Sequence, residues 1–216
     1  MTEIALDSLE KRLDLWRGEF GDAYRERNGA TESMLRALRG QWSQFLAPVA
    51  GAPPRSILEV GANIGLNLRA LRALTDAEFY AVEPNQRAAD QMVGDGVLPA
   101  ANVKVADGSN IPFADASVDL AFTSGVLIHI HPSDHEKVCK EMYRVSRRYI
   151  GCIEYFADRP REIPYHGFTG ALFLRDFGHM WMTACPDLVL RGHGFFWRHA
   201  GAADSMNWWL FEKAGA

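Results

Sequence analysis

The fold is decided by the stretch ILEVGANIG, residues 57–65, in which a short apolar strand runs directly into a turn that carries glycine. The next leucines recur at helical spacing: Leu66, Leu68, Leu71 and Leu74. The stretch therefore opens a strand–turn–helix unit. Glycine lets a backbone approach a ligand closely, and the first turn of a helix has free amide groups that bind anionic or polar atoms. This unit is a candidate nucleotide-binding turn, and a tight turn without a ligand is the alternative.

Strand and helix patterns alternate along the rest of the chain. An amphipathic helix is expected over residues 31–46. Strands are expected at residues 57–60, 79–82, 103–105, 118–123, 149–153, 189–197 and 207–213. Helices are expected at residues 66–74 and 85–92 and after Ser133, where Ser133 and Glu136 stand in a capping box. The alternation predicts an α/β, Rossmann-like fold with a seven-stranded, mostly parallel sheet, helices on both faces and an antiparallel C-terminal edge hairpin.

Length and composition fit one domain. The chain has 216 residues, of which 48% are hydrophobic, so one well-filled core is expected. We expect a single domain over residues 1–216, with an N-terminal helical cap over residues 1–50. The periodicity breaks over residues 155–186, which are rich in aromatic residues, glycine and proline. That segment is expected to be an insertion on the side where a substrate binds.

Charge, hydropathy and cysteine usage disfavour several classes of protein. The net charge of -4 is spread over both signs without a basic block, which disfavours nucleic acid as a partner. No run approaches the ~20 apolar residues of a membrane span, and the acidic N-terminus does not resemble a signal peptide, so we expect a cytoplasmic protein without membrane contact. Cys139, Cys152 and Cys185 are odd in number and widely spaced, which predicts reduced structural thiols. Monomer and homodimer both stay open.

Glu83 makes the glycine turn more specific. It ends the second expected strand about 20 residues after the turn, where a carboxylate hydrogen-bonds the hydroxyls of a ribose. Enzymes that bind NAD also combine a glycine turn with an acidic residue after the second strand. A dinucleotide site, however, requires a second glycine at the position of Asn63, because the pyrophosphate approaches the backbone there. Asparagine tolerates a left-handed backbone but brings a side chain. A ligand without a diphosphate, such as S-adenosylmethionine, is compatible with that side chain.

A third element follows in the same order. Residues 106–109 (ADGS) end the third expected strand, and Asp107 can accept a hydrogen bond from an adenine amino group; residues 111–113 (IPF) come next. The glycine turn, the ribose acid, the adenine-side acid and the Pro-Phe step in this order resemble the class I S-adenosylmethionine-dependent methyltransferases. The resemblance covers residues 56–154 and departs from the common glycine triplet at Asn63. It implies S-adenosylmethionine as the cofactor.

Several further segments resemble a narrower group, the pseudaminic acid biosynthesis-associated methylases. The segments are residues 16–24 with Arg27 and Asn28, 61–67, 125–130, 154–155, 162–165 and 173–177. Within this group asparagine is the usual residue at the position of Asn63, so it is not a departure there. The resemblance implies a methyl donor and, by genomic association, a nine-carbon acidic sugar or its precursor as acceptor, although such association does not prove a substrate.

The expected cofactor contacts lie at the ends of the strands. They are Glu59, Gly61, Asn63, Gly65, Glu83, Pro84, Asp107, Gly108, Ser109, Ser124, Gly125 and Val126. Leu127 and Ile128 are expected to pack beside adenine and methionine. Trp16, Phe20 and Tyr24 form a helical stripe, which is usually core, but a helix before the first strand often forms a lid in this superfamily. Tyr24, Arg27 and Asn28 are therefore added as second-tier cofactor contacts.

Three residues are candidates for chemistry: His129, Glu154 and Tyr165. His129 is either a structural histidine or a general base, since imidazole titrates near working pH. Glu154 closes the fifth expected strand, where it either orients an acceptor or serves as a cap or an ion-pair partner of Arg175. Tyr165 either lines the substrate or packs in the core. No metal is expected, because the His-x-His pair 129–131 has no nearby thiolate or clear carboxylate partner.

Four residues are expected to contact the acceptor: His131, Tyr155, His166 and Arg175. The aromatic side chains can wall the substrate and exclude water, or pack in the core. Arg175 either clamps a substrate carboxylate or forms an ion pair with Asp176 or Glu162.

The function expected from these residues is methyl transfer to O or N of a small polar metabolite, with a nonulosonic acid sugar or precursor as the favoured class. Little chemical help is needed, because a sulfonium is already a good leaving group and alignment in a dry pocket supplies much of the acceleration. The alternatives are a natural-product tailoring enzyme that uses S-adenosylmethionine for other chemistry, a nicotinamide-dependent oxidoreductase and a non-catalytic binding module.

Overall fold

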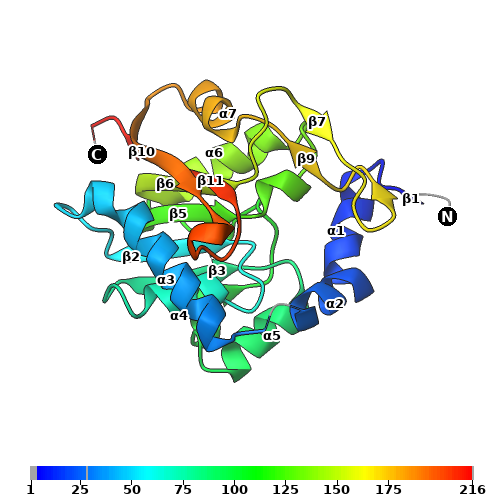
Figure 1. Cartoon of the computed structure of the whole chain (residues 1–216), viewed down its shortest axis with the longest axis horizontal. Helices are drawn as coiled ribbons and strands as arrows, with labels where there is room; N and C mark the ends of the chain where they lie inside the picture. The colour runs from blue at the N-terminus through cyan, green and yellow to red at the C-terminus, as the bar shows by residue number, and fades with distance from the viewer. Residues whose placement is uncertain (1–3, 28, 216) are drawn as a thin grey trace.

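A computed structural model describes residues 4–27 and 29–215 of the chain. A seven-stranded sheet in the order β10-β11-β6-β5-β2-β3-β4 forms its centre (Figure 1). The strands are β2 (Ser56–Val60), β3 (Glu78–Val82), β4 (Val103–Lys104), β5 (Val118–Ser124), β6 (Ser146–Glu154), β10 (Leu188–Phe196) and β11 (Met206–Lys213). The five strands β2 to β6 are parallel, whereas β11 pairs antiparallel with both β6 and β10. The predicted Rossmann-like α/β fold is confirmed, including its antiparallel C-terminal edge.

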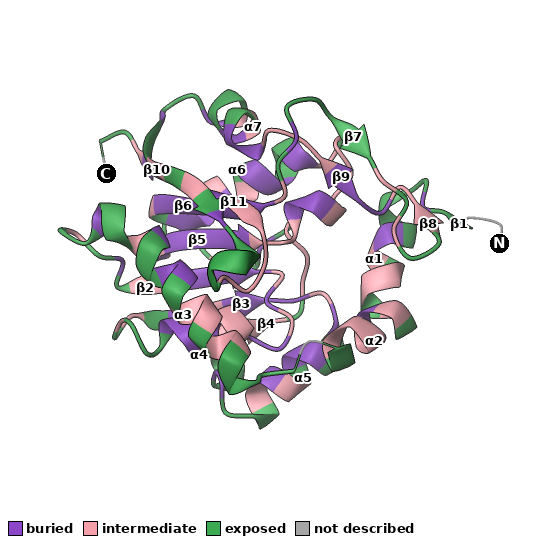
Figure 2. Cartoon of the chain, in the orientation of Figure 1, coloured by how far each residue is buried: buried purple, intermediate pink, exposed green. Residues whose placement is uncertain are grey.

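Helices cover both faces of the sheet, as the alternation of patterns predicted. The helices are α3 (Glu32–Leu46), α4 (Leu66–Leu71), α5 (Gln86–Gly94), α6 (His135–Val145) and α7 (Phe177–Ala184), with short 3-10 helices η1 (Ala47–Val49), η2 (Ala100–Asn102), η3 (Leu127–His129) and η4 (Arg198–Ala200). Side chains of α3, α4 and α5 join one buried cluster, and those of α6 and α7 join the other. The central strands β2, β5 and β6 are mostly buried, whereas the edge strand β10 is largely exposed (Figure 2).

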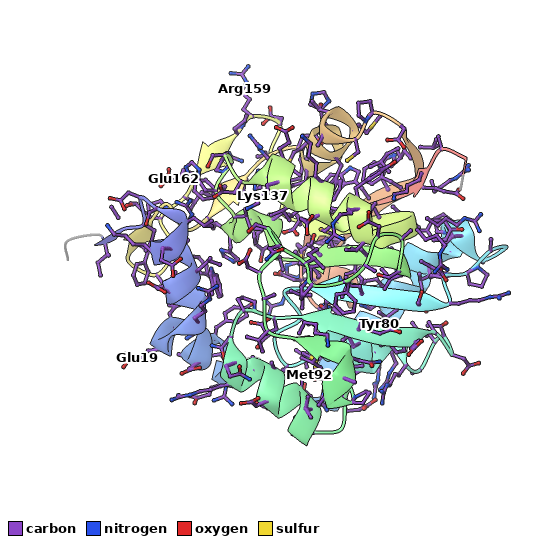
Figure 3. All side chains as sticks on the ribbon, turned by 180° about the vertical axis from the view of Figure 1, so that it is seen from behind. Glu19, Tyr80, Met92, Lys137, Arg159 and Glu162 are labelled. Atoms are coloured by element: carbon purple, nitrogen blue, oxygen red, sulfur yellow. The ribbon has the colours of Figure 1, made fainter. Side chains whose placement is uncertain are left out.

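Two segments that are far apart in sequence meet beside the sheet. Helices α1 (Leu9–Arg17) and α2 (Glu19–Arg27) lie on the same side of the molecule as the segment over residues 155–186, as the labels Glu19 and Glu162 show in Figure 3. Strand β1 (Ile4–Ala5) pairs in parallel with β8 (Phe168–Thr169), which joins the two segments. Strand β7 (Arg161–Glu162) pairs with β9 (Phe173–Leu174) inside the later segment. Its helix α7 and these short strands were not predicted.

The predicted capping box at Ser133 is wrong. Helix α6 begins at His135, and Asp134, which precedes it, makes no side-chain cap. The cause is competition, because the Ser133 hydroxyl lies 2.8 Å from Nδ1 of His131 and Oδ2 of Asp134 accepts from Arg12 at 3.1 Å. Both capping groups are therefore used elsewhere.

The three cysteines are free and buried, in agreement with the expected reduced structural thiols. Among the described helices, none is long and apolar enough to cross a membrane. Within residues 4–27 and 29–215 we find no group of three or more His, Cys, Asp or Glu side chains arranged to hold a metal ion.

Candidate functional site

A cavity of about 220 Å³ lies at the carboxyl edge of the parallel strands. The segments that follow β2, β3, β4 and β5 form its floor, and α1 and α2 cover it. Of the predicted cofactor contacts, those that line the cavity are Glu59, Gly61, Asn63, Glu83, Pro84, Asp107, Gly108, Ser109, Ser124, Gly125, Val126 and Tyr24. Asn28, another predicted contact, lies outside the described residues. Side chains separated by more than 100 positions therefore meet around one space.

The turn after β2 has the backbone that its sequence predicts. Gly61 has φ 79°, and a Cβ there would stand 2.6 Å from a methyl group of Val126, so only glycine fits. Asn63 has φ 48°, a left-handed conformation that asparagine tolerates better than most residues. Gly65, at φ 74°, precedes α4 and packs against Met92. Gly65 does not line the cavity, so its role is in the backbone and not in the predicted ligand contact.

Glu83 ties the turn to the end of β3. One carboxylate oxygen accepts from the backbone N–H of Asn63 at 2.7 Å and the other from that of Asn85 at 2.8 Å. The side chain is only 6% exposed, and burial raises its pKa to about 7, against the opposing effect of the two amides. Each oxygen keeps a second lone pair toward the cavity, which is the geometry that a pair of ribose hydroxyls requires.

Glu59 presents one unpaired oxygen to the cavity. Its Oε1 accepts from Nδ2 of Asn67 at 2.6 Å, and Oδ1 of Asn67 in turn accepts from Nε1 of Trp42 at 3.0 Å. Oε2 is buried and has no hydrogen-bond partner among residues 4–27 and 29–215. Burial raises the pKa of Glu59 to about 8. A buried polar atom without a partner invites a ligand, and a carboxylate here suits a cationic group.

The N-terminal helices are held over the cavity by polar contacts. Arg12 of α1 is buried and donates to the carbonyl of Leu6 at 3.0 Å and to Asp134 at 3.1 Å. Nδ2 of Asn85 donates to the Trp16 carbonyl at 3.0 Å. Arg17 lies 3.8 Å from Oδ2 of Asp107, so α1 reaches the end of β4 as well. These contacts anchor α1 beside the cavity that it helps to line.

His129 lines the cavity as a neutral imidazole. Its Nδ1 lies 2.7 Å from the carbonyl oxygen of Ala171, and since a carbonyl only accepts, Nδ1 carries the proton. Nε2 therefore keeps its lone pair. Burial lowers the pKa of His129 to about 4. The ring stands 4.6 Å from Trp16 and 5.0 Å from Tyr165, measured between centroids.

Glu154 has the capping role that the sequence left open. It is fully buried, and its oxygens accept from the amides of Val126 at 3.2 Å, Leu127 at 3.0 Å and Ile128 at 3.4 Å. The carboxylate thus fixes η3, which carries His129, and it does not line the cavity. An acceptor-orienting role and an ion pair with Arg175 are both unsupported in the described residues.

Arg175 is also occupied structurally. It donates to Nδ1 of the buried His135 at 3.0 Å, and Nε2 of His135 donates to the Leu127 carbonyl at 2.9 Å. Neither of the ion pairs considered for it, with Asp176 and with Glu162, occurs in the described part of the chain; Glu162 accepts from Gly170 instead. Arg175 lies outside the cavity lining, so its predicted clamp role has no support.

The other predicted acceptor residues divide between the cavity and the covering segment. His131 lines the cavity. Tyr165 and His166 lie beside Phe20 of α2, with ring centroids 5.9 and 5.8 Å from it. Tyr155 donates to Oδ2 of Asp204 at 2.5 Å. Tyr165, His166 and Tyr155 are not among the residues that line the cavity.

Some cavity residues were missed. Leu127 and Ile128, expected beside the ligand, are buried in the core, and Ile130 and Val138 line the cavity instead. Arg12 and Asn67 were also missed. Asn67 closes the motif GANIGLN and donates to Glu59 from the first turn of α4, so its place in the motif was a signal available in the sequence; Arg12 had no local signal.

The fold and this cavity together define a Rossmann-like α/β domain with a cavity at the carboxyl edge of its parallel strands. Residues 58–149 match a family model described as "Methyltransferase domain". An uncharacterized methyltransferase of Mycobacterium sp. (strain JLS) is 33% identical over 135 residues, which are 62% of this chain and 51% of that protein. The chain spans about half the length of the curated relatives it matches.

Solved structures show the same fold at low identity. A Burkholderia thailandensis 1,6-didemethyltoxoflavin-N1-methyltransferase, with bound 1,6-didemethyltoxoflavin and S-adenosylhomocysteine, has a TM-score of 0.72 and 16% identity over 98% of this chain and 93% of its own. A Synechocystis PCC 6803 magnesium protoporphyrin IX methyltransferase with bound SAM has a TM-score of 0.68 and 12% identity over 99% of this chain and 100% of its own. These structures share the fold of the chain, and residues 58–149 match a methyltransferase domain.

Proposed function

We propose that the protein transfers a methyl group from S-adenosylmethionine to O or N of a small polar metabolite, with an acidic nine-carbon sugar or its precursor as the favoured acceptor. The observation that carries the proposal is the cavity that Glu83, the glycine turn and Glu59 line together, with Oε2 of Glu59 buried and without a partner in the described residues. The acidic sugar rests on the resemblance of segments such as residues 61–67 and 173–177 to pseudaminic acid biosynthesis-associated methylases.

Each polar group of the donor has a candidate partner in the cavity. Glu83 suits the ribose hydroxyls, Asp107 the adenine amino group and Glu59 the ammonium of the methionine part. Two of the similar structures carry S-adenosylhomocysteine or S-adenosylmethionine, which supports this assignment. The side chain of Asn63 stands where a dinucleotide would bring its pyrophosphate, which disfavours NAD.

The acceptor would be activated mainly by position. S-adenosylmethionine supplies a methyl group on a sulfonium, which is a good leaving group. The acceptor loses a proton as its O or N bonds to the methyl carbon, and the lone pair on Nε2 of His129 is a candidate to take that proton. With a pKa near 4 His129 is a weak base, which suits a reaction that depends on alignment and exclusion of water.

The same proposal covers organisation and partners. The chain acts as one domain with a cap over residues 1–50 and an insertion over residues 155–186. Its partner is a small molecule rather than nucleic acid, supported by the net charge of -4 and by the helices over the cavity. Cytoplasmic location and a monomeric or homodimeric state belong to the proposal as well.

Calorimetric titration with S-adenosylhomocysteine tests the donor site. We expect Glu83→Ala to weaken binding at least about tenfold, because two hydrogen bonds to a charged group are lost. Glu78→Ala is the matched control, since Glu78 begins the same strand at its exposed end. A Glu83→Ala protein that binds as tightly as the parent would place the pocket elsewhere. Tight binding of NAD alone would favour an oxidoreductase.

Product analysis tests the reaction. S-adenosylhomocysteine as the product indicates methyl transfer. Methylthioadenosine would show that another bond of the sulfonium breaks, as in other tailoring chemistry.

A further inference from the structure

Three tyrosine hydroxyls converge beside the donor cavity. Tyr24 comes from α2, Tyr155 follows β6, and Tyr165 belongs to the segment between β7 and β8. The Tyr165 hydroxyl helps to raise the pKa of Tyr24 to about 12, with burial as the larger cause, and both hydroxyls help to raise the pKa of Tyr155. The ring centroid of Trp16 lies 5.5 Å from that of Tyr24 and 4.6 Å from that of His129, and His129 lies 5.0 Å from Tyr165. Tyr24 and Tyr165 therefore belong to one group of rings, and the electrostatic effects of both on Tyr155 agree with a place for it beside them.

Asp204 fixes one of these hydroxyls. It lies in the connection between β10 and β11, and its Oδ2 accepts the Tyr155 hydroxyl at 2.5 Å while Oδ1 accepts the Ser205 amide at 2.8 Å. Because the Tyr155 proton points at Asp204, the hydroxyl oxygen offers its lone pairs to a donor on the other side. Burial and this carboxylate both raise the pKa of Tyr155, so the hydroxyl stays protonated.

Arg27 supplies a positive charge on the opposite side of the cluster. Its guanidinium lies 5.8 Å from the ring centroids of both Phe20 and Tyr24, and its charge acts to lower the pKa of Tyr24 and Tyr165. No carboxylate in the described residues forms an ion pair with it. Arg12 and Arg175, in contrast, are engaged by Asp134 and His135. Arg27 is exposed, and within residues 4–27 and 29–215 no hydrogen bond or ion pair occupies its guanidinium, which has the donors to bind a carboxylate through two hydrogen bonds.

The cluster adjoins the reacting end of the donor cavity. Tyr24 lines that cavity, and Tyr165 stands 5.0 Å from the ring of His129. Asp204 is two residues before Met206, whose methyl carbon lies 3.7 Å from the position of a Cβ on Gly125 at the end of β5. Tyr24 and Tyr165 therefore connect the cluster to the part of the cavity that His129 lines.

We infer that Arg27, Tyr24, Tyr155, Tyr165 and Asp204 form the acceptor site, and that the acceptor carries a carboxylate bound by Arg27 and a hydroxyl or amine bound by Tyr155 and Asp204. The inference rests on the proposed methyl transfer and deepens it by naming the residues that hold an acidic acceptor. A guanidinium binds a carboxylate through two parallel hydrogen bonds, whereas a carboxylate with a tyrosine oxygen binds a hydrogen-bond donor. The rings between them exclude water.

The test uses protein saturated with S-adenosylhomocysteine and a panel of carboxylated sugars, nonulosonic acids among them, each paired with its neutral carboxamide. Calorimetry should show at least one acid bound about tenfold more tightly than its carboxamide, the size of one charge-assisted contact. Arg27→Gln should remove that preference, while Asp204→Asn and Tyr155→Phe should weaken both members of the pair equally. Arg36→Gln, which removes an exposed cation from α3, is the control and should keep the preference.

Two results overturn the acceptor site. One is a wild-type protein that binds no acid of the panel better than its carboxamide, including the case in which neither member binds. The other is an Arg27→Gln protein that keeps the preference. All variants should bind S-adenosylhomocysteine like the parent, within about twofold. If the parent itself does not bind S-adenosylhomocysteine, the proposed methyl transfer fails, and that result is distinct from loss of acid preference alone.

Discussion

Glu59 is held in place by residues on two other elements. Trp42 of α3 orients the amide of Asn67, and Asn67 holds Oε1 of Glu59, which leaves Oε2 for the donor. Asn67→Leu should therefore weaken the binding of S-adenosylhomocysteine about tenfold, because Glu59 loses its orienting hydrogen bond. Binding of 5′-methylthioadenosine, which lacks the amino-acid part, should change less than about twofold. Calorimetry with the two ligands measures the difference.

Trp42→Phe is the milder companion of that variant. It removes the indole N–H and keeps an aromatic ring against Phe45 and Phe122. We expect a selective loss of affinity for S-adenosylhomocysteine here too. The loss should be smaller than in Asn67→Leu, since Asn67 keeps its contact with Glu59. Equal losses for both ligands would mean general damage to the cavity and would contradict the orienting role.

The site residues that could be predicted are those whose role is set by the local chain. Gly61 and Asn63 occupy left-handed positions in one turn, and Glu83 ends the adjacent parallel strand, so strand order alone brings them together. Glu154 and Arg175 could not be assigned in this way. Their partners, the amides of η3 and His135, are 26 or more positions distant and become neighbours only through tertiary packing.

At the scale of elements, η3 is held from three directions. Glu154 caps its amides, Ala171 accepts from His129, and Arg175 supports His135, which donates to Leu127. Arg175→Leu would leave Nδ1 of the buried His135 without a donor. We expect a loss of about 1–3 kcal/mol in the free energy of unfolding, measured by urea denaturation. Binding of S-adenosylhomocysteine to the folded protein should be unchanged.

The control for this variant is Arg159→Leu. Arg159 is exposed and lies in the same segment, and its side chain points away from the molecule in Figure 3. It should leave the free energy of unfolding within about 0.5 kcal/mol of the parent. If Arg175→Leu is as stable as this control but binds a carboxylated acceptor poorly, Arg175 is a clamp after all.

Elements differed in how well the sequence predicted them. Strands such as β2 and β5 carry continuous apolar runs, and α3 carries a long apolar stripe, so each pattern identifies its element without the rest of the chain. Strands β7, β8 and β9 have two residues each, which is too short to show a pattern in the sequence. Such short strands are stabilised by their neighbours. Helix α7 has eight residues and two buried aromatic side chains, and an isolated helix of this length is marginal in water.

For the whole molecule, buried titratable groups make stability depend on pH in two opposite directions. Burial raises the pKa of Glu59 to about 8 and those of Glu83 and Glu154 to about 7, so the folded protein binds these protons more tightly than the unfolded chain. Their contribution is present at low pH and is lost as the pH rises through 7 and 8. Burial lowers the pKa of His129 and His135 to about 4, so their contribution is lost as the pH falls from 6.5 toward 4.

Above pH 6.5 the two histidines are neutral in the folded state and lose their remaining protons in the unfolded state, so their opposing slope fades and the three carboxyl groups should dominate. We expect the free energy of unfolding of the ligand-free protein to fall between pH 6.5 and 8, by at most about 1.4 kcal/mol per pH unit for each carboxyl group. Glu59→Gln should flatten this slope, and so should saturating S-adenosylhomocysteine, whose ammonium favours the ionised carboxylate. Glu136→Gln, an exposed change on α6, should not. Urea denaturation at several pH values measures the slope. If the stability of the parent rises over this range, the buried carboxyl groups are not held protonated in the folded state. If the slope of Glu59→Gln equals that of the parent, Glu59 is not one of the groups that set it.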